Sequence, residues 1–199
     1  SLNPNDKIEN NVKQPVIKSL RWDRSFKKWI CPFLMSGINT RIVRRTNAIA
    51  NFSYGENFKY SEVSSFNKGL YGFLKALTML MTLFFLQLSL RSKLLLWILK
   101  NIIFPKPGEG PSKNKMKNGF FKFKIIGSIN KIQKNSVTVI GDSDPGYSGT
   151  AKMLTESALS ILLSENKIPK KYGILTPASG IGLILIKRLQ VKGISFKVD

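Results

Sequence analysis

Residues 70–90 read LYGFLKALTMLMTLFFLQLSL, an apolar run whose only charge is Lys75 and whose only amide is Gln87. A second apolar run, LLLWILKNIIF at 94–104, ends before Pro105. As helices the two runs would be about 31 Å and about 16 Å long, and only the first matches a hydrocarbon core of about 30 Å. Because residues 76–90 are apolar all round, this helix is predicted to be either deeply buried or placed in lipid.

The membrane interpretation is favoured over a buried helix pair, because covering two such runs would use most of the core that 199 residues can build. Basic residues stand on both sides of the run, so no positive-inside asymmetry orients it. A span, a hairpin and a helix lying in one leaflet with lysines at the headgroups all stay open. We therefore expect 70–104 to be a membrane- or lipid-associating helical segment.

The composition excludes several classes of protein. The net charge is +21, which suits an anionic membrane surface or nucleic acid, but no zinc-finger or RNP-like signature accompanies it, so we expect no nucleic-acid partner. The chain has no histidine and one cysteine, Cys31, which excludes a histidine-based triad, a zinc finger and an internal disulfide. We expect no metal site. The chain starts with serine, and we expect it to be a fragment or to lack its true start.

The part before the apolar run is polar and basic. Residues 1–32 are expected to be a basic, poorly ordered lead-in, and a helix is expected to follow, capped by Asn39 or Thr40. Residues 54–63, YGENFKYSEV, alternate as a strand does. Arg44 and Arg45, together with Arg41, lie at helical spacings on this first helix. They could bind phosphate or carboxylate, or form only a solvated basic face.

The part after the apolar run changes to strand and helix patterns. A Pro/Gly/Lys loop at 105–118 is the clearest linker. The remaining elements are expected as a hairpin of strands 120–126 and 136–140 with a turn at 130–135, a helix at 150–163, a strand at 172–176, a helix at 179–190 and a last strand at 194–198. The helix at 150–163 should bury Met153, Leu154, Ala158, Ile161 and Leu162. The prediction is an α+β domain of 33–69 and 119–199, with a small mixed or antiparallel sheet and packed helices, interrupted by the apolar segment and without a complete Rossmann domain.

Several of these stretches together resemble one family. They are IVRRT at 42–46, the apolar segment at 70–104, PGY at 145–147, IPKKYGILTP at 168–177 and the segment 189–196 with KGI. In this order and spacing they resemble the C-terminal half of the saccharopine dehydrogenase-like oxidoreductases, relatives of saccharopine reductase and of trans-acting enoyl reductases. Asn39 departs from the family, which usually carries an acid there, and so does TAK at 150–152.

The resemblance implies an oxidoreductase-type, lipid-associated protein of lipid or glycolipid metabolism. It implies that NAD or NADP binds an N-terminal Rossmann domain of the intact protein, that this chain lacks that half and binds no cofactor, and that alone it is inactive. The chain would be a substrate-side domain that can form a homodimer. Its expected location is an intracellular membrane: lipid droplet, endoplasmic reticulum or mitochondrion.

Residues 172–199 also imitate a dinucleotide fingerprint, with a glycine loop, a helix and a strand that ends at Asp199. We reject this match because Pro177 replaces the first glycine and removes an N–H donor to phosphate. Tyr71 and Lys75 spell a Tyr-x-x-x-Lys motif, but they lie in the apolar run and upstream of the glycine loop. No catalytic residue is assigned.

The candidates for substrate-side contacts are Tyr147, Thr176, Arg44 and Arg45. If strands 136–140 and 172–176 are neighbours in one sheet, Tyr147 and Thr176 should converge at one edge and offer two hydroxyls. Alternatively, Pro-Gly and Thr-Pro only shape turns. The alternative function is a non-enzymatic, basic, membrane-anchored interaction protein.

Overall fold

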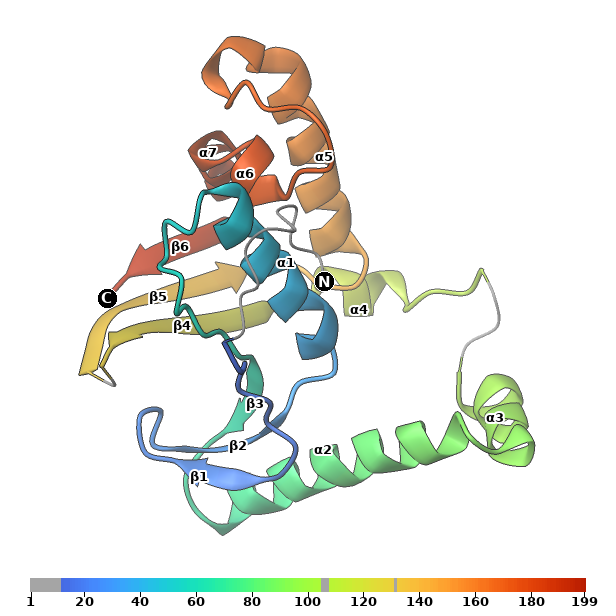
Figure 1. The fold of residues 1–199 in the computed structure, drawn as a ribbon. Helices are drawn as coiled ribbons and strands as arrows, with labels where there is room; N and C mark the ends of the chain where they lie inside the picture. Colours follow the sequence, from blue (N-terminus) through green and yellow to red (C-terminus); the bar gives the residue numbers. More distant parts are fainter. Residues whose placement is uncertain (1–11, 105–107, 131) are drawn as a thin grey trace. The chain divides into compact units, whose positions relative to one another are not determined.

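The computed structural model describes residues 12–104, 108–130 and 132–199 (Figure 1). It divides into two compact units, Ser1–Glu109 and Gly110–Asp199. Each contains a three-stranded antiparallel sheet with helices, which confirms the predicted α+β class. The division falls inside the predicted loop 105–118, and residues 33–69 and 119–199, expected to make one domain, lie in different units.

The sheet of the first unit is built from β1 (Arg21–Asp23), β2 (Lys28–Pro32) and β3 (Val63–Phe66), with β2 in the middle. Asp23 closes the β1–β2 turn by accepting hydrogen bonds from the backbone N–H groups of Ser25 and Phe26 at 2.9 and 3.0 Å. Where we expected a poorly ordered lead-in, residues 21–32 thus form two paired strands. Ile30 and Cys31 of β2 are buried.

Helix α1 (Ser36–Ile49) begins before Asn39 and Thr40, so neither residue caps it as predicted. The Asn39 amide instead donates to the Glu62 carboxylate at 2.9 Å. Residues 54–60 are not part of a strand, which corrects the predicted alternation. Asn47 explains why, because its side chain accepts from Tyr54 N–H at 2.8 Å and donates to Gly55 C=O at 3.1 Å, which holds the segment in turns.

The apolar run forms α2 (Leu70–Ser89), followed by the short helix α3 (Lys93–Ile98) and a π-helical turn, η1 (Leu99–Ile103). Among the described residues, α2 is the one helix long and apolar enough to cross a membrane, and only 17% of its apolar window is buried. It packs on β2 and β3, and Phe73 near its start contacts Trp29 of β2. The predicted helix is confirmed, and many of its apolar residues are exposed.

The second unit contains a short helix, α4 (Lys113–Lys117), and the sheet β4 (Phe121–Ile129), β5 (Ile132–Gly141) and β6 (Ile194–Val198). β5 lies in the middle and pairs antiparallel with both neighbours, so the predicted hairpin and last strand are confirmed. The turn is shorter than the expected 130–135, because β5 already begins at Ile132 and Asn130 takes a φ of 51°.

The helices of this unit are α5 (Ser148–Leu163), a 3₁₀ turn η2 (Glu165–Lys167), α6 (Pro177–Gly180) and α7 (Leu183–Val191). The predicted helix 179–190 is divided where Gly182 adopts a φ of 67°. The strand predicted at 172–176 is not formed: these described residues are bends and coil, with Gly173 at a φ of 103° and Tyr172 91% exposed. A positive φ cannot continue an extended strand, which explains the error.

The core of the second unit lies between α7 and the sheet, where Ile181, Leu185, Leu189 and Ile194 are buried. α5 packs Met153 against this core, but Leu154, Ala158, Ile161 and Leu162 of its predicted buried side are exposed. The buried side chains of α5 are instead Glu156 and Ser160. Glu156 turns inward because Arg188 of α7 pairs with it at 2.8 Å.

Candidate functional site at the loop between β5 and α5

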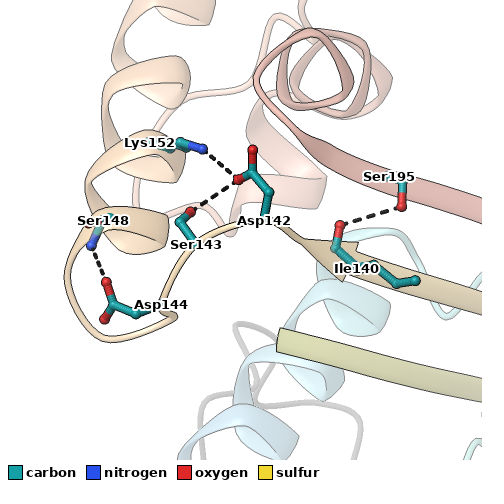
Figure 2. A network of polar contacts seen from close by, with 7 residues as sticks. All are labelled: Ile140, Asp142, Ser143, Asp144, Ser148, Lys152 and Ser195. Carbon is teal, nitrogen blue, oxygen red and sulfur yellow. Dashed lines mark hydrogen bonds and ion pairs between the residues drawn. The ribbon is translucent and has the colours of Figure 1, made fainter. Parts of the chain in front are cut away.

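The loop of residues 142–147 connects the end of β5 to the start of α5, and Figure 2 shows its polar contacts. The Asp144 carboxylate accepts hydrogen bonds from the backbone N–H groups of Gly146, Tyr147 and Ser148 at 3.0, 2.8 and 2.9 Å. A carboxylate placed here satisfies N–H groups that have no partner within the helix and complements the positive end of the helix dipole. These bonds, that of Ser148 first, lower the pKa of Asp144.

Asp142 is the second acid of the loop and is held by α5. Lys152 Nζ lies 2.6 Å from Asp142 Oδ1, and the Ser143 hydroxyl donates to the same oxygen at 3.3 Å (Figure 2). The hydrogen bond from Lys152 is the main reason why the pKa of Asp142 is lowered. On the other side, Asp142 N–H donates to Gly193 C=O at 3.3 Å, which connects the loop to the turn before β6.

The two carboxylates therefore orient the loop rather than exchange protons. With lowered pKa values both are ionised at neutral pH, and their oxygens already accept hydrogen bonds. The Asp142–Lys152 pair was not predicted from the sequence. The sequence offers an acid at the end of a predicted strand and a lysine in the first turns of the following helix. This combination is too common to predict an ion pair.

Tyr147 is an aromatic residue of this loop whose side chain reaches solvent. It is 53% exposed, and its backbone N–H is held by Asp144. Its ring lies beside Gly110, where an added Cβ would be 3.4 Å from the ring carbon Cε1. The arrangement presents a phenol, which can donate a hydrogen bond to a carbonyl oxygen and stack on a planar group.

Thr176 has a different environment. It is 4% exposed, and it forms a capping box with Ser179 at the start of α6: Ser179 N–H donates to the Thr176 hydroxyl at 3.3 Å, and Thr176 N–H donates to the Ser179 hydroxyl at 3.0 Å. Pro177 stands in the first turn of α6. The convergence of Thr176 with Tyr147 was expected on a strand at 172–176, which is absent from this described segment. The capping interpretation accounts for these bonds of Thr176.

Arg44 and Arg45 lie on α1 in the first unit, whereas Tyr147 and Thr176 lie in the second. Arg44 Nε donates to Thr40 C=O within α1 at 3.1 Å, and both arginines are half-buried. The four predicted residues are thus divided between the two units.

The comparisons with known proteins concern the chain as a whole. The chain is similar to trans-acting enoyl reductases. It is 32% identical over 171 residues to a provisionally named trans-acting enoyl reductase of Mycobacterium tuberculosis, which covers 85% of this chain and 41% of that protein. It is 30% identical over 175 residues to the trans-acting enoyl reductase of Mycobacterium bovis and over 169 residues to that of Mycobacterium leprae, each time covering 83% of this chain and 40% of the relative.

These enoyl reductase relatives support an oxidoreductase-type family. The chain spans about two fifths of the length of the curated relatives that it matches. No protein-family profile matches the chain. No solved structure matches it either.

Enoyl reductase relatives suggest a cofactor of the NAD(P)H type in the intact proteins, and the glycine loop at 177–182 is the stretch of this chain that resembles a pyrophosphate site. Such a site presents free N–H groups at the start of a helix that follows a parallel strand. Here the Thr176 hydroxyl accepts from Ser179 N–H, Pro177 has no N–H, and α6 is only four residues long. β6 pairs antiparallel with β5. These residues do not fit a dinucleotide. Among the described residues no group of three histidine, cysteine or acidic side chains could hold a metal ion.

Proposed function

We propose that this chain is the substrate-side part of a saccharopine dehydrogenase-like oxidoreductase that reduces an enoyl group in lipid metabolism. The observation that carries the proposal is the 30–32% identity to trans-acting enoyl reductases over more than four fifths of the chain. The intact protein would hold NAD or NADP on residues outside this chain, since the glycine loop at 177–182 does not fit a dinucleotide.

Reduction of an enoyl thioester adds a hydride to the β-carbon and then a proton to the α-carbon. Between these two transfers, negative charge develops on the carbonyl oxygen. A donor aimed at that oxygen stabilises the transition state more than the ground state. We assign this role to the Tyr147 hydroxyl. Its support is geometric: Asp144 holds the backbone of Tyr147 at the start of α5, and the phenol reaches solvent.

The apolar segment 70–104 would hold this activity at a membrane or at a lipid droplet, where acyl substrates with long chains gather. The support is the exposure of α2, of which Phe84 and Phe85 are more than half exposed. Attachment through apolar contacts resists salt, whereas attachment through charge alone is weakened by screening. We therefore expect high salt to leave the protein in the membrane fraction. Full recovery in the soluble fraction would contradict this part of the proposal.

The test of the activity uses the intact reading frame and a 2-enoyl thioester, with NADPH or NADH oxidation followed by absorbance and the saturated product by mass spectrometry. We expect Tyr147→Phe to lower turnover about 100-fold, the scale of losing one donor to an oxyanion. Its melting temperature should stay unchanged. The matched control is Tyr172→Phe, which removes a hydroxyl from another exposed tyrosine of the same unit and should keep full activity.

One result would overturn the proposed activity, and another would overturn only the role of Tyr147. Absence of saturated product from enoyl thioesters of every chain length would favour the non-enzymatic interaction protein. Equal turnover of Tyr147→Phe and Tyr172→Phe would keep the oxidoreductase but remove Tyr147 from the site.

A further inference from the structure

The N-terminal part of α2 is fixed to the sheet of the first unit. Ala76 is fully buried, and the Phe73 ring packs edge-on against Trp29 of β2, with ring centroids 5.1 Å apart. A Cβ on Gly72 would overlap the carbonyl of Asn67, so the chain that enters the helix lies directly against it. From its start to Ala76, α2 is therefore an integral part of a small β-sheet layer.

This sheet cannot enter a hydrocarbon core. β1 and β3 are its edge strands, and open edges leave backbone N–H and C=O groups that lipid cannot satisfy. The turn between β1 and β2 carries Arg24 and Lys27 beside Trp22 and Trp29, whose rings are 5.4 Å apart. Basic and aromatic side chains together are typical of the headgroup region. The part of α2 that is fixed to the sheet must stay at this level or in water.

The rest of α2 suits lipid. Its exposed apolar residues from position 77 onward are Leu77, Met81, Phe84, Phe85, Leu88 and Leu90. Its hydroxyl groups bond to the carbonyls of the helix itself: Thr78 donates to Leu74 C=O at 3.0 Å, Thr82 to Thr78 C=O at 2.9 Å and Ser89 to Phe85 C=O at 2.7 Å. No polar group among these three has to be left unsatisfied in an apolar solvent.

The part of α2 beyond Ala76 is too short to cross. Residues 77–90 extend about 21 Å, against about 30 Å for the hydrocarbon core. Arg91 and Lys93 follow immediately, and a helix standing upright would leave these cations inside the core. Lys75, whose Nζ lies 4.4 Å from the centre of the Tyr71 ring, precedes this part. Both ends of the segment therefore have to reach headgroups. The headgroups within reach belong to the leaflet on the side of the sheet.

The charge around this segment identifies the headgroups. Residues 63–108 contain no aspartate or glutamate, and they carry Lys68, Lys75, Arg91, Lys93, Lys100 and Lys106. Cations next to a membrane surface are attracted to anionic lipids, and their long stems let the amino groups reach the surface from apolar surroundings.

Building on the membrane association proposed above, we propose that residues 77–104 lie in one leaflet of a membrane with anionic phospholipids, with both ends on the same side. By length and composition alone α2 could span a bilayer, but its packing on the sheet removes the residues that a span would need. The segment acts as an in-plane anchor.

The test locates the two ends of α2 in sealed microsomes during cell-free synthesis of the intact protein. Ser65→Cys places a thiol on the exposed surface of β3, and Ser92→Cys places one in the turn after α2. Cys31 is fully buried, so the unchanged protein serves as the blank for a membrane-impermeant maleimide. We expect both variants to be labelled from outside, with no more than a twofold increase when detergent opens the vesicles.

Labelling of Ser92→Cys only after permeabilisation, with Ser65→Cys labelled before it, would mean a span and overturn the inference while keeping the membrane association. Failure of both variants and of the unchanged protein to float with microsomes would overturn the membrane association and the inference with it. A second measurement compares flotation with phosphatidylcholine vesicles and with vesicles that also contain phosphatidylserine. Binding at least tenfold stronger to the latter is expected, and equal binding would overturn the assignment of anionic lipid.

Discussion

Gly193 lies in the turn before β6 at a φ of 87°, and a Cβ there would overlap the Asp142 carboxylate. We expect Gly193→Ala to lower stability by more than backbone strain alone, because it also displaces Asp142 from Lys152. The control is Gly173→Ala, since Gly173 has a φ of 103° and open space around it. That control should cost about 1–2 kcal/mol, the usual cost of a left-handed alanine. Urea unfolding of both variants compares them, and an equal loss would contradict the prediction.

Asp144 should make the second unit sensitive to acid. Its pKa is lowered in the folded protein, so its contribution to stability is present above its unfolded pKa of about 3.9 and is lost as the pH falls through the folded pKa. We expect Asp144→Asn to melt earlier than the unchanged protein near neutral pH, and the two melting curves to converge in acid. A difference in melting temperature that is the same at every pH would show that the charge of Asp144 contributes nothing.

The packing of α5 on α7 depends on a buried ion pair. The Glu156 side chain is 5% exposed, Arg188 Nη2 and Nε each lie 2.8 Å from its Oε2, and Lys192 Nζ is 4.0 Å from its Oε1. Arg188→Met should lower the free energy of unfolding by about 3 kcal/mol, because the buried carboxylate of Glu156 would then have only the more distant Lys192 as a charged partner. The double variant Glu156→Leu/Arg188→Met removes both charges and should recover most of this loss in urea unfolding. A double variant less stable than Arg188→Met would contradict the prediction.

The exposed face of α2 should decide whether the protein binds membranes. Phe84 and Phe85 are 55% and 56% exposed, so Phe84→Glu/Phe85→Glu should keep the fold but release the protein from microsomes, since ionised carboxylates are strongly disfavoured in hydrocarbon. The matched control, Leu154→Glu/Leu162→Glu, changes two exposed leucines of α5 in the other unit and should stay bound. Release of the control to the same extent would mean that general surface hydrophobicity, not α2, holds the protein.

At the scale of the whole molecule, we expect residues 1–199 alone to bind neither NAD(H) nor NADP(H) in a calorimetric titration. The start of α6 lacks the free N–H groups that a pyrophosphate needs, because Pro177 and the Thr176–Ser179 capping box occupy it. The intact reading frame, titrated in parallel, should bind one of the two dinucleotides. Micromolar binding by residues 1–199 would place the cofactor on this chain and mean that the glycine loop accepts a pyrophosphate after all.

Local patterns were sufficient for several elements. The alternation at 120–126 and the β-branched run at 136–140 predicted the β4–β5 hairpin, and the apolar run at 70–90 predicted α2. The strand at 194–198 was also predicted with its bounds. In each case the type of element could be predicted from residues close together in the sequence, because the period of the apolar residues sets which of them share a face. The α+β class follows from these elements.

The candidate site was predicted only in part. The start of α5 was found from Asp144 and Tyr147, because an acid followed by Pro-Gly shapes a turn wherever it stands. The role of Thr176 depended on a strand that would have to pair, and in the structure Gly173 and the capping box of α6 prevent this. Arg44 and Arg45 were named as candidates from their helical spacing, and no local pattern contains the division of the chain that places them in a different compact unit from Tyr147.

The sequence by itself determined that a β-hairpin and several helices are present, that one helix is apolar on every side, and that this chain has no histidine and cannot form an internal disulfide. Only the tertiary structure decided which strands pair and which side chains are buried against each other. β1 and β2 form because β3 lies about 30 residues further on to pair with β2, and α5 buries Glu156 rather than its leucines because Arg188 lies opposite on α7. It also decided how much of α2 remains for lipid, since Phe73 packs on Trp29 of β2, Gly72 lies against Asn67 and Ala76 is buried. Such choices depend on contacts between residues distant in the chain, whose free energy outweighs local preference.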